Sequence, residues 1–108
     1  MIRGEVYWHK FKQPDKKRPV VILTRNILIP ELNVLTVAPI TTTMRETETQ
    51  VFLDETDGIK KDSAVNLTNI QTVEKNKLGS FITHLSPDKM FEIAEAIKFS
   101  LQLEVEFS

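Results

Sequence analysis

The stretch KKRPVVIL, from Lys16 to Leu23, places three cations directly before a run of apolar, mostly β-branched residues. Such a run is typical of a short strand buried in a protein core. The cations are unexpected in a chain whose formal net charge is only −1. The stretch therefore predicts a buried strand with positive charge gathered at its start.

The positive charge extends over the N-terminal part of the chain. Residues 1–25 contain seven lysines and arginines but only two acids, whereas residues 86–108 have a net charge of −3. A lysine-rich segment of this kind is usually a solvated loop. The alternative is an anion-binding site, which the near-neutral total does not exclude because the two ends of the chain differ in sign.

Other short strands are predicted around this stretch. The patterns indicate strands at residues 3–8, 19–23, 34–40, 50–53 and 64–67. No helical pattern separates them, which favours a curled antiparallel sheet or a small barrel. Only the C-terminal segment is typical of a helix, because Ser86 can cap it and Pro87 suits its first position. Its apolar face is formed by Met90, Ile93, Ala94, Ile97 and Leu101.

The size and composition of the chain limit its class. The chain has 108 residues, of which 41% are hydrophobic and 27% are charged. This composition predicts one globular domain over residues 1–108. Dimerisation is a common way for so small a domain to bury more surface. No apolar segment is long enough for a signal peptide or a membrane span, so we expect a cytoplasmic protein with no membrane partner. Without cysteine and with two distant histidines, no metal and no cofactor are predicted.

The acidic segment DETDG, from Asp54 to Gly58, groups carboxylates of the kind that bind calcium. An EF-hand loop with Gly58 at its sixth position would begin at Leu53 and end at Ala64, where acidic ligands are required. A solvent-facing turn is therefore the better interpretation.

The two histidines have different surroundings. His84 lies in the apolar segment FITHL, so we expect a hydrogen-bonded core residue rather than a catalyst. His9 follows the aromatic pair Tyr7 and Trp8 near a predicted strand end. The sequence leaves open whether the role of His9 is structural or ligand-facing.

Three successive threonines, residues 41–43, and then Arg45 follow the apolar strand that ends at Ile40. Threonines at a strand end usually reflect strand propensity and turn chemistry. If this strand pairs with the strand of KKRPVVIL, Arg18 and Thr41 meet at one rim of the sheet. A guanidinium beside a hydroxyl suits a phosphate diester, so the sequence indicates an anion site there.

Five blocks of the chain carry a resemblance to a known family. They are RGEVYW (3–8), RPVVIL (18–23), VAPITTT (37–43), DSAVNLTNIQTV (62–73) and HLSPDKMFEIAEAI (84–97). In this order and spacing they resemble the MazF/PemK toxins, the endoribonucleases of bacterial type II toxin–antitoxin modules. The resemblance covers nearly the whole chain.

The resemblance implies a mostly β (α+β) fold of the CcdB/MazF kind, an SH3-like barrel of bent antiparallel strands with a C-terminal helix. It implies a homodimer with single-stranded RNA, expected to be messenger RNA, across the subunit interface. Cleavage would be sequence-specific and metal-independent, by attack of the 2′-hydroxyl, with a cognate antitoxin covering the same surface. Operator DNA would be contacted only through the antitoxin.

The resemblance also assigns site residues. The arginine of the family's RP motif falls on Arg18 and the threonine that closes its third apolar strand falls on Thr41, so these two are the catalytic candidates. Arg18 would stabilise charge on the phosphorane and Thr41 would hydrogen-bond a phosphate oxygen or the attacking hydroxyl, while the proton acceptor stays open. The RNA-binding candidates are Lys16, Lys17, Thr42, Thr43, Arg45, Asn69 and Gln71.

Two departures from the family pattern bear on activity. The first loop, from His9 to Lys17, is short and lacks the usual glycine-rich GSEQ-like segment, so Lys16 and Lys17 are expected to replace it electrostatically. Some members also use an arginine and an aspartate where this chain has Asn66 and Thr68, so that alternative catalytic set is absent.

Two other functions suit the same fold. A CcdB-like toxin binds DNA gyrase and cuts nothing, but it relies on a distinctive C-terminal tail that LEVEFS does not reproduce. A non-catalytic barrel that binds nucleic acid or protein would explain the basic residues as well as a nuclease does. An RNA cleavage assay separates these alternatives.

Overall fold

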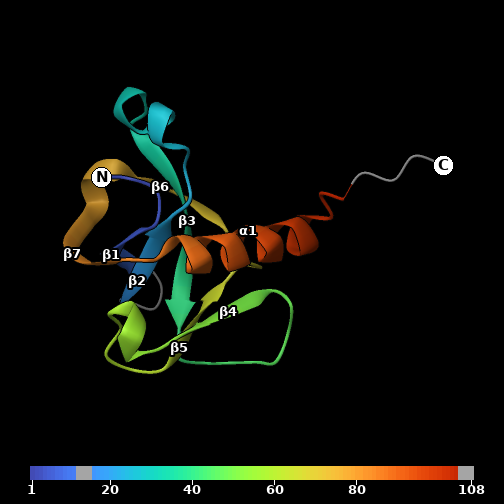
Figure 1. The fold of residues 1–108 in the computed structure, drawn as a ribbon. Coiled ribbons are helices and arrows are strands. Elements are labelled where there is room, and N and C mark those ends of the chain that lie inside the picture. Colours follow the sequence, from blue (N-terminus) through green and yellow to red (C-terminus); the bar gives the residue numbers. More distant parts are fainter. Residues whose placement is uncertain (12–15, 105–108) are drawn as a thin grey trace.

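The protein is an antiparallel β-sheet with one α-helix lying across it (Figure 1). The computed structural model describes residues 1–11 and 16–104, and the side chains of Phe11 and Lys16 are outside that description. The strands are β1 (Glu5–Phe11), β2 (Lys16–Ile22), β3 (Val34–Thr41), β4 (Gln50–Leu53), β5 (Ser63–Asn66), β6 (Gln71–Glu74) and β7 (Leu78–His84). The helices are α1 (Pro87–Leu101) and the 3₁₀ turns η1 (Asn26–Glu31), η2 (Glu55–Asp57) and η3 (Lys75–Lys77).

The strands follow the order β4–β5–β3–β2–β1–β7, and β6 also pairs with β3. One edge of β3 pairs with β2, whereas its other edge pairs with β6 along the first half and with β5 at the end, so the sheet divides there. The predicted mostly β fold with a C-terminal helix is confirmed. The path of paired strands is open, with β4 and β7 at its two ends.

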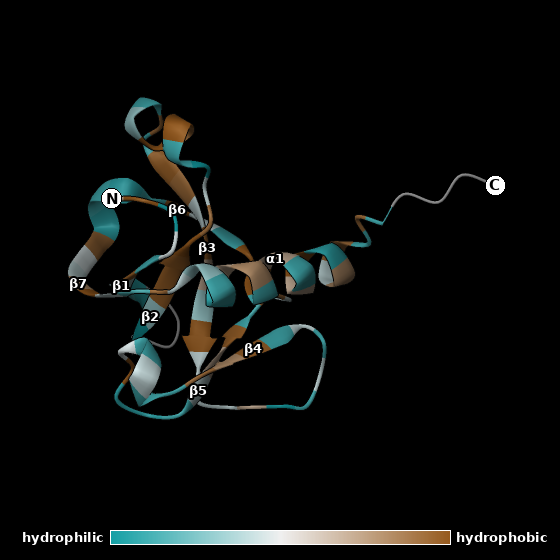
Figure 2. Ribbon diagram, in the orientation of Figure 1, coloured by the Kyte–Doolittle hydropathy of each residue, from teal (hydrophilic) through white to brown (hydrophobic). Residues whose placement is uncertain are grey.

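The central strand β2 is buried on both faces, which explains its unbroken apolar run. Val20, Val21 and Ile22 are fully buried. Val21 packs in the cluster that contains Ile93 of α1, whereas Val20 and Ile22 pack in a second cluster that contains Ile29 of η1. Hydrophobic colour accordingly runs through β2 and into β3, while the outer loops are mostly hydrophilic (Figure 2). The buried strand predicted from KKRPVVIL is confirmed.

Helix α1 begins and ends as local signals require. The Ser86 hydroxyl accepts a hydrogen bond from the Lys89 main-chain nitrogen at 3.2 Å, and Pro87 is the first helical residue, as predicted. The helix ends at Leu101, because Gln102 has a φ of 53° in the left-handed region. Across the part of the chain that the structure describes, no helix has the length and apolar character to span a membrane.

The sequence patterns do not indicate β6 or β7, and one prediction about β7 is wrong. β6 directs only Val73 into the core, and β7 is an end strand whose side chains are mostly exposed, so neither shows apolar alternation. His84 on β7 is exposed rather than part of the core, because β7 pairs with β1 and forms an end of the sheet.

Two predictions concern residues outside this description. The centre of the short first loop, residues 12–15, and most of the C-terminal segment LEVEFS, residues 105–108, are not among the described residues.

The turn predicted at DETDG is present, with η2 inside it and Gly58 at its end.

Candidate active site

The pairing of β2 with β3 brings the two candidate catalytic residues to one rim of the sheet. Val20 pairs with Pro39 and Val21 pairs with Ala38 in antiparallel register. Continuing this register by two residues places Arg18 opposite Thr41. Both residues line one pocket of about 800 Å³, here called the Arg18 pocket.

Four parts of the chain form the Arg18 pocket. They are Trp8 of β1 with Lys17–Pro19 of β2, the end of β3 from Ile40 through Thr43, the loop from Gly58 to Lys61 with Ser63 of β5, and Phe81 and Ile82 of β7. The volume lies within the usual range for small-ligand sites, and the pocket combines apolar side chains with hydroxyls and cations. Ser63 is 3% exposed, and its hydroxyl has no hydrogen-bond partner among the described residues.

The pocket concentrates positive charge. Lys17, Arg18, Lys60 and Lys61 line it, and no acidic residue does so among those described. None of these four cations forms an ion pair with a described carboxylate. Cations in a cleft without neighbouring carboxylates attract anions, so the pocket suits a phosphate-bearing ligand. This local charge is positive although the net charge of the whole protein is −1.

The sequence patterns indicate Lys17 and Arg18 but not Lys60 and Lys61. The only signal for the second pair is the dipeptide itself, directly after the DETDG turn. The aromatic residues Trp8 and Phe81 are also absent from the predicted site. All of these residues join the pocket through strand pairing and loop packing between distant segments.

Thr41 has its hydroxyl oxygen held in a defined turn. That oxygen accepts a hydrogen bond from the Thr43 main-chain nitrogen at 3.1 Å. No described residue accepts the hydroxyl proton, so it can donate to a ligand, which suits contact with a phosphate oxygen. Thr42 and Thr43 also line the pocket.

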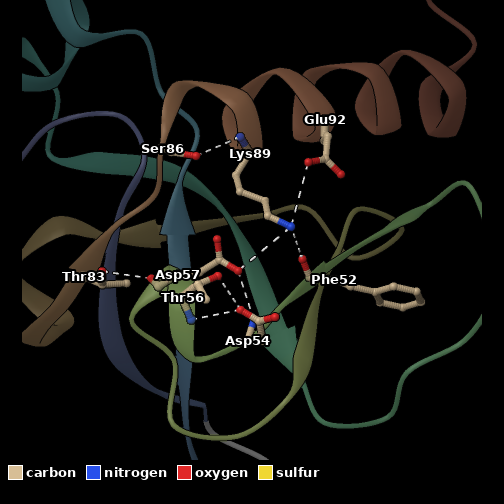
Figure 3. Close-up of polar contacts among 8 residues, drawn as sticks. All are labelled: Phe52, Asp54, Thr56, Asp57, Thr83, Ser86, Lys89 and Glu92. Carbon is tan, nitrogen blue, oxygen red and sulfur yellow. Dashed lines mark hydrogen bonds and ion pairs between the residues drawn. The ribbon is translucent and has the colours of Figure 1, made fainter.

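The loop from Gly58 to Lys61 starts from an anchored turn (Figure 3). The Asp54 carboxylate accepts hydrogen bonds from the Thr56 hydroxyl at 2.6 Å and the Thr56 main-chain nitrogen at 2.9 Å. These bonds hold the pKa of Asp54 below its ordinary value. The Asp57 carboxylate accepts a bond from the Asp54 main-chain nitrogen at 3.0 Å, which completes a reciprocal capping box.

Lys89 connects this turn to the helix and to β4 (Figure 3). Its ammonium donates a hydrogen bond to the Phe52 carbonyl oxygen at 2.7 Å and lies 4.0 Å from the Asp57 carboxylate and 3.9 Å from that of Glu92. From β7, the Thr83 hydroxyl donates to the Asp57 carbonyl oxygen at 3.1 Å. The loop therefore enters the Arg18 pocket from a turn that is fixed to α1, β4 and β7.

Among the described residues, which include the DETDG segment, no group of three histidine or acidic side chains could hold a metal ion.

His9 lies beside Arg18 in the sheet. The two residues are paired directly between β1 and β2, and His9 does not line the pocket. Burial lowers the pKa of His9 below its ordinary value of 6.5, so the neutral form is favoured near neutral pH. The structure thus places His9 within the sheet, next to a candidate catalytic residue.

The remaining RNA-binding candidates do not line the Arg18 pocket. The Arg45 main-chain nitrogen donates to the Gln50 side-chain oxygen at 2.7 Å in the β3–β4 connection. Asn69 lies in the turn after β5, and Gln71 of β6 pairs with Val37 of β3. Lys16 begins β2, but its side chain is outside the description.

Asn66 and Thr68 have a local structural role. The Asn66 side-chain oxygen accepts hydrogen bonds from the Thr68 main-chain nitrogen at 3.1 Å and from the Thr68 hydroxyl at 2.6 Å. This is an Asx turn that joins β5 to the following segment. Neither residue lines the Arg18 pocket.

A smaller hollow lies between η1 and the end of α1. It has a volume of about 420 Å³ and is lined mainly by apolar side chains such as Leu28 and Leu101. Arg3 also lines it, but its guanidinium donates a hydrogen bond to the Leu23 carbonyl oxygen. Arg25 is the second cation of this hollow, whereas four cations line the Arg18 pocket, so the Arg18 pocket is the better anion site.

An antiparallel sheet with a C-terminal helix is also the fold of solved structures from one class of bacterial toxins. Residues 2–101 match the family of PemK-like, MazF-like toxins of type II toxin–antitoxin systems. The chain belongs to this family.

Individual relatives agree along most of the chain. Endoribonuclease MazF3 of Mycobacterium tuberculosis is 42% identical over 92 residues, which cover 85% of this chain and 89% of the relative. Endoribonuclease EndoA of Bacillus subtilis is 30% identical over 109 residues, which cover 94% of each chain.

Solved structures show the same fold. The Mycobacterium tuberculosis toxin MazF-mt6 matches with a TM-score of 0.85 and 38% identity, covering 94% of this chain and 99% of that one. An endoribonuclease in complex with its cognate antitoxin, from a mycobacterial species, matches with a TM-score of 0.88 and 26% identity, covering 98% and 99%.

Proposed function

We propose that this protein is an endoribonuclease toxin that cuts single-stranded RNA in the Arg18 pocket. The observation that carries the proposal is the convergence of Arg18 and Thr41, from paired strands, on a pocket whose charged lining is entirely cationic among the described residues. The relatives named as endoribonucleases support the same activity.

RNA contains its own nucleophile, so the protein has to position and stabilise rather than attack. The 2′-oxygen forms a bond to the adjacent phosphorus as the bond to the 5′-oxygen breaks. The 2′-hydroxyl loses its proton to an acceptor and the leaving 5′-oxygen gains one. The products are a 2′,3′-cyclic phosphate and a 5′-hydroxyl. Holding the two reacting atoms in line, without water competing, lowers the barrier substantially.

Arg18 and Thr41 have complementary roles in this step. A guanidinium keeps its charge at ordinary pH and presents two parallel donors to two phosphate oxygens, so Arg18 stabilises the charge that develops on the phosphorane. Thr41 donates its hydroxyl proton to a phosphate oxygen or to the 2′-oxygen, because no described residue accepts that proton while Thr43 donates to the oxygen. Lys17 holds the neighbouring phosphate backbone by charge.

The partners follow from the same surface. One mycobacterial relative is solved with its cognate antitoxin. For this chain we infer a cognate antitoxin with an acidic and apolar segment that covers the Arg18 pocket and so competes with RNA. We also infer a homodimer acting on RNA in the cytoplasm, with operator DNA contacted only through the antitoxin.

The decisive experiment uses purified protein and single-stranded RNA in excess EDTA. We expect cleavage with 2′,3′-cyclic phosphate ends, no cleavage when the nucleotide at the cut carries a 2′-deoxyribose, and near-complete loss of cleavage in Arg18→Ala. Lys77→Ala is the matched control, because Lys77 is an exposed lysine that does not line the pocket. Strict dependence on added magnesium, or equal cleavage of the deoxy substrate, would contradict the mechanism. RNA binding without cleavage would instead support the non-catalytic alternative.

A further inference from the structure

We propose that Trp8, Phe81 and the loop from Gly58 to Lys61 form a subsite for the nucleotide that adjoins the scissile phosphate. The base of that nucleotide stacks on the aromatic side chains, and Lys60 and Lys61 bind the phosphate on its far side. The inference rests on the proposed endoribonuclease function and adds to it the residues that hold and select the neighbouring nucleotide.

The path of the Gly58–Lys61 loop places its lysines across the pocket from Arg18. The loop begins at Gly58, which lies against Thr83 on β7, and β5 follows it with Ala64 paired to Thr41 on β3. In the sheet order, β1 and β2 lie between β7 and β3. The loop therefore crosses in front of the ends of β1 and β2, and the pocket is the space between them.

The side chains of Lys60 and Lys61 make no polar contact within the part of the chain that the structure describes. Both side chains are exposed, and neither forms a hydrogen bond or an ion pair with any described residue. By contrast, Lys75 and Lys89 each donate a hydrogen bond to a main-chain carbonyl oxygen. Two free ammonium groups on a loop with an anchored start are suited to hold a phosphate at a set distance from Arg18.

The aromatic residues add a stacking surface to the pocket that the cations line. Trp8 is 39% exposed and Phe81 is 52% exposed, and both line the pocket. The Phe81 ring is held by an edge-to-face contact with Tyr7, with ring centroids 5.7 Å apart and an interplanar angle of 75°. An ordered, exposed ring next to cations is the usual arrangement for stacking an unpaired base.

Gly79 of β7 lies against the start of the Trp8 side chain. Phe81 pairs with Tyr7, and the next pair is Leu78 with His9, so a register irregularity places Gly79 next to Trp8. The Gly79 Cα carries no side chain, and a Cβ built there would contact the Trp8 carbonyl oxygen at 3.4 Å and the Trp8 Cβ at 3.5 Å. Gly79 therefore packs closely against the backbone and the first side-chain carbon of Trp8 and adds no side chain of its own there.

The test begins by mapping a cut site in RNA and synthesising a short RNA that spans it, with a 2′-deoxyribose at the cut so that it binds without being cleaved. Its dissociation constant is measured at several salt concentrations. For Lys60→Ala combined with Lys61→Ala, we expect the slope of log affinity against log salt to become shallower by about 0.7, for the one phosphate that the variant no longer neutralises. Lys77→Ala should keep the wild-type slope.

A second arm examines stacking by replacing each base near the cut with an abasic site. One abasic position beside the cut should weaken wild-type binding about tenfold or more. In Phe81→Leu the same abasic change should have almost no further effect, because the stacking partner is already missing. Trp8→Leu repeats the test independently. Phe91→Leu, at an exposed phenylalanine on α1, should retain the full abasic effect.

The outcomes separate the subsite from the proposed function. Thermal unfolding of each variant shows whether it folds. If Trp8→Leu does not fold, Phe81→Leu alone provides the test of stacking. If wild-type protein cuts RNA but the lysine and aromatic variants behave as their controls do, the subsite is wrong and the function stands. If wild-type protein neither cuts nor binds RNA, both are overturned.

Discussion

Gly58 lies directly against Thr83, so that a Cβ built on Gly58 would be 2.3 Å from the Thr83 hydroxyl oxygen and 2.8 Å from its Cβ. The φ of Gly58 is 86°, in the left-handed region that favours glycine. This contact joins the turn of η2 to β7 at the entrance of the Arg18 pocket. Glycine is thus required there both for its backbone conformation and for its lack of a side chain.

Gly58→Ala is accordingly expected to lower the free energy of unfolding by about 2–4 kcal/mol, from backbone strain and overpacking together. Gly79→Ala is the matched control, because its nearest neighbour would be at an ordinary contact distance of 3.4 Å. That variant should change the free energy of unfolding by about 1 kcal/mol or less. Urea denaturation measures both, and equal effects would contradict the close approach at Gly58.

Lys89→Met should destabilise the protein by about 1–2 kcal/mol while keeping the length of the side chain. The substitution removes the hydrogen bond to the Phe52 carbonyl oxygen and the cation beside the Asp57 carboxylate, whose side chain is only 9% exposed. Lys98→Met is the control, because the Lys98–Glu95 pair is about half exposed on both sides and should contribute less than about 0.5 kcal/mol. Similar shifts of the urea midpoint in the two variants would show that the Lys89 contacts add no stability.

Arg18→Lys distinguishes the shape of the guanidinium from its charge. If Arg18 clamps the reacting phosphate, lysine retains the attraction but loses the two parallel donors, so single-turnover cleavage should slow about a hundredfold while RNA affinity stays within a few fold. Lys17→Ala should instead weaken binding more than cleavage. Rates at saturating enzyme, measured beside equilibrium binding, separate the two effects. An unchanged cleavage rate in Arg18→Lys would reduce Arg18 to one cation of a solvated basic surface.

His9 should make stability depend on pH near neutrality. Burial lowers the pKa of His9 in the folded protein below 6.5, so the unfolded chain takes up a proton that the folded protein resists. The His9 contribution to the free energy of unfolding is therefore constant above about pH 6.5 and decreases as the pH falls from there toward the folded pKa. In urea denaturation between about pH 7.5 and about pH 5.5, His9→Gln should lose less stability on acidification than wild type. An equal or larger loss in His9→Gln would contradict the lowered pKa.

Part of the candidate active site could be predicted from the sequence because it depends on two adjacent strands. Arg18 directly precedes the buried run of β2, and Thr41 directly follows the apolar part of β3. Antiparallel pairing of those strands is enough to bring the two residues to one rim. The presence of Lys60, Lys61 and Phe81 in the Arg18 pocket could not be predicted in this way, because their position depends on how the η2 turn is held against β7 and α1.

What the sequence determined by itself is local: the buried strand β2, whose apolar run needs cover on both faces, and helix α1, whose Ser86 cap and Pro87 start are properties of neighbouring residues. Only the tertiary structure decided that His84 is exposed on an end strand and that Lys60 and Lys61 face the same pocket as Arg18. The physical reason is that burial and charge clustering depend on which distant segments pack together. The positive φ of Gly58 and the contacts of Lys89 and Thr83 with Asp57 of the η2 turn establish that packing.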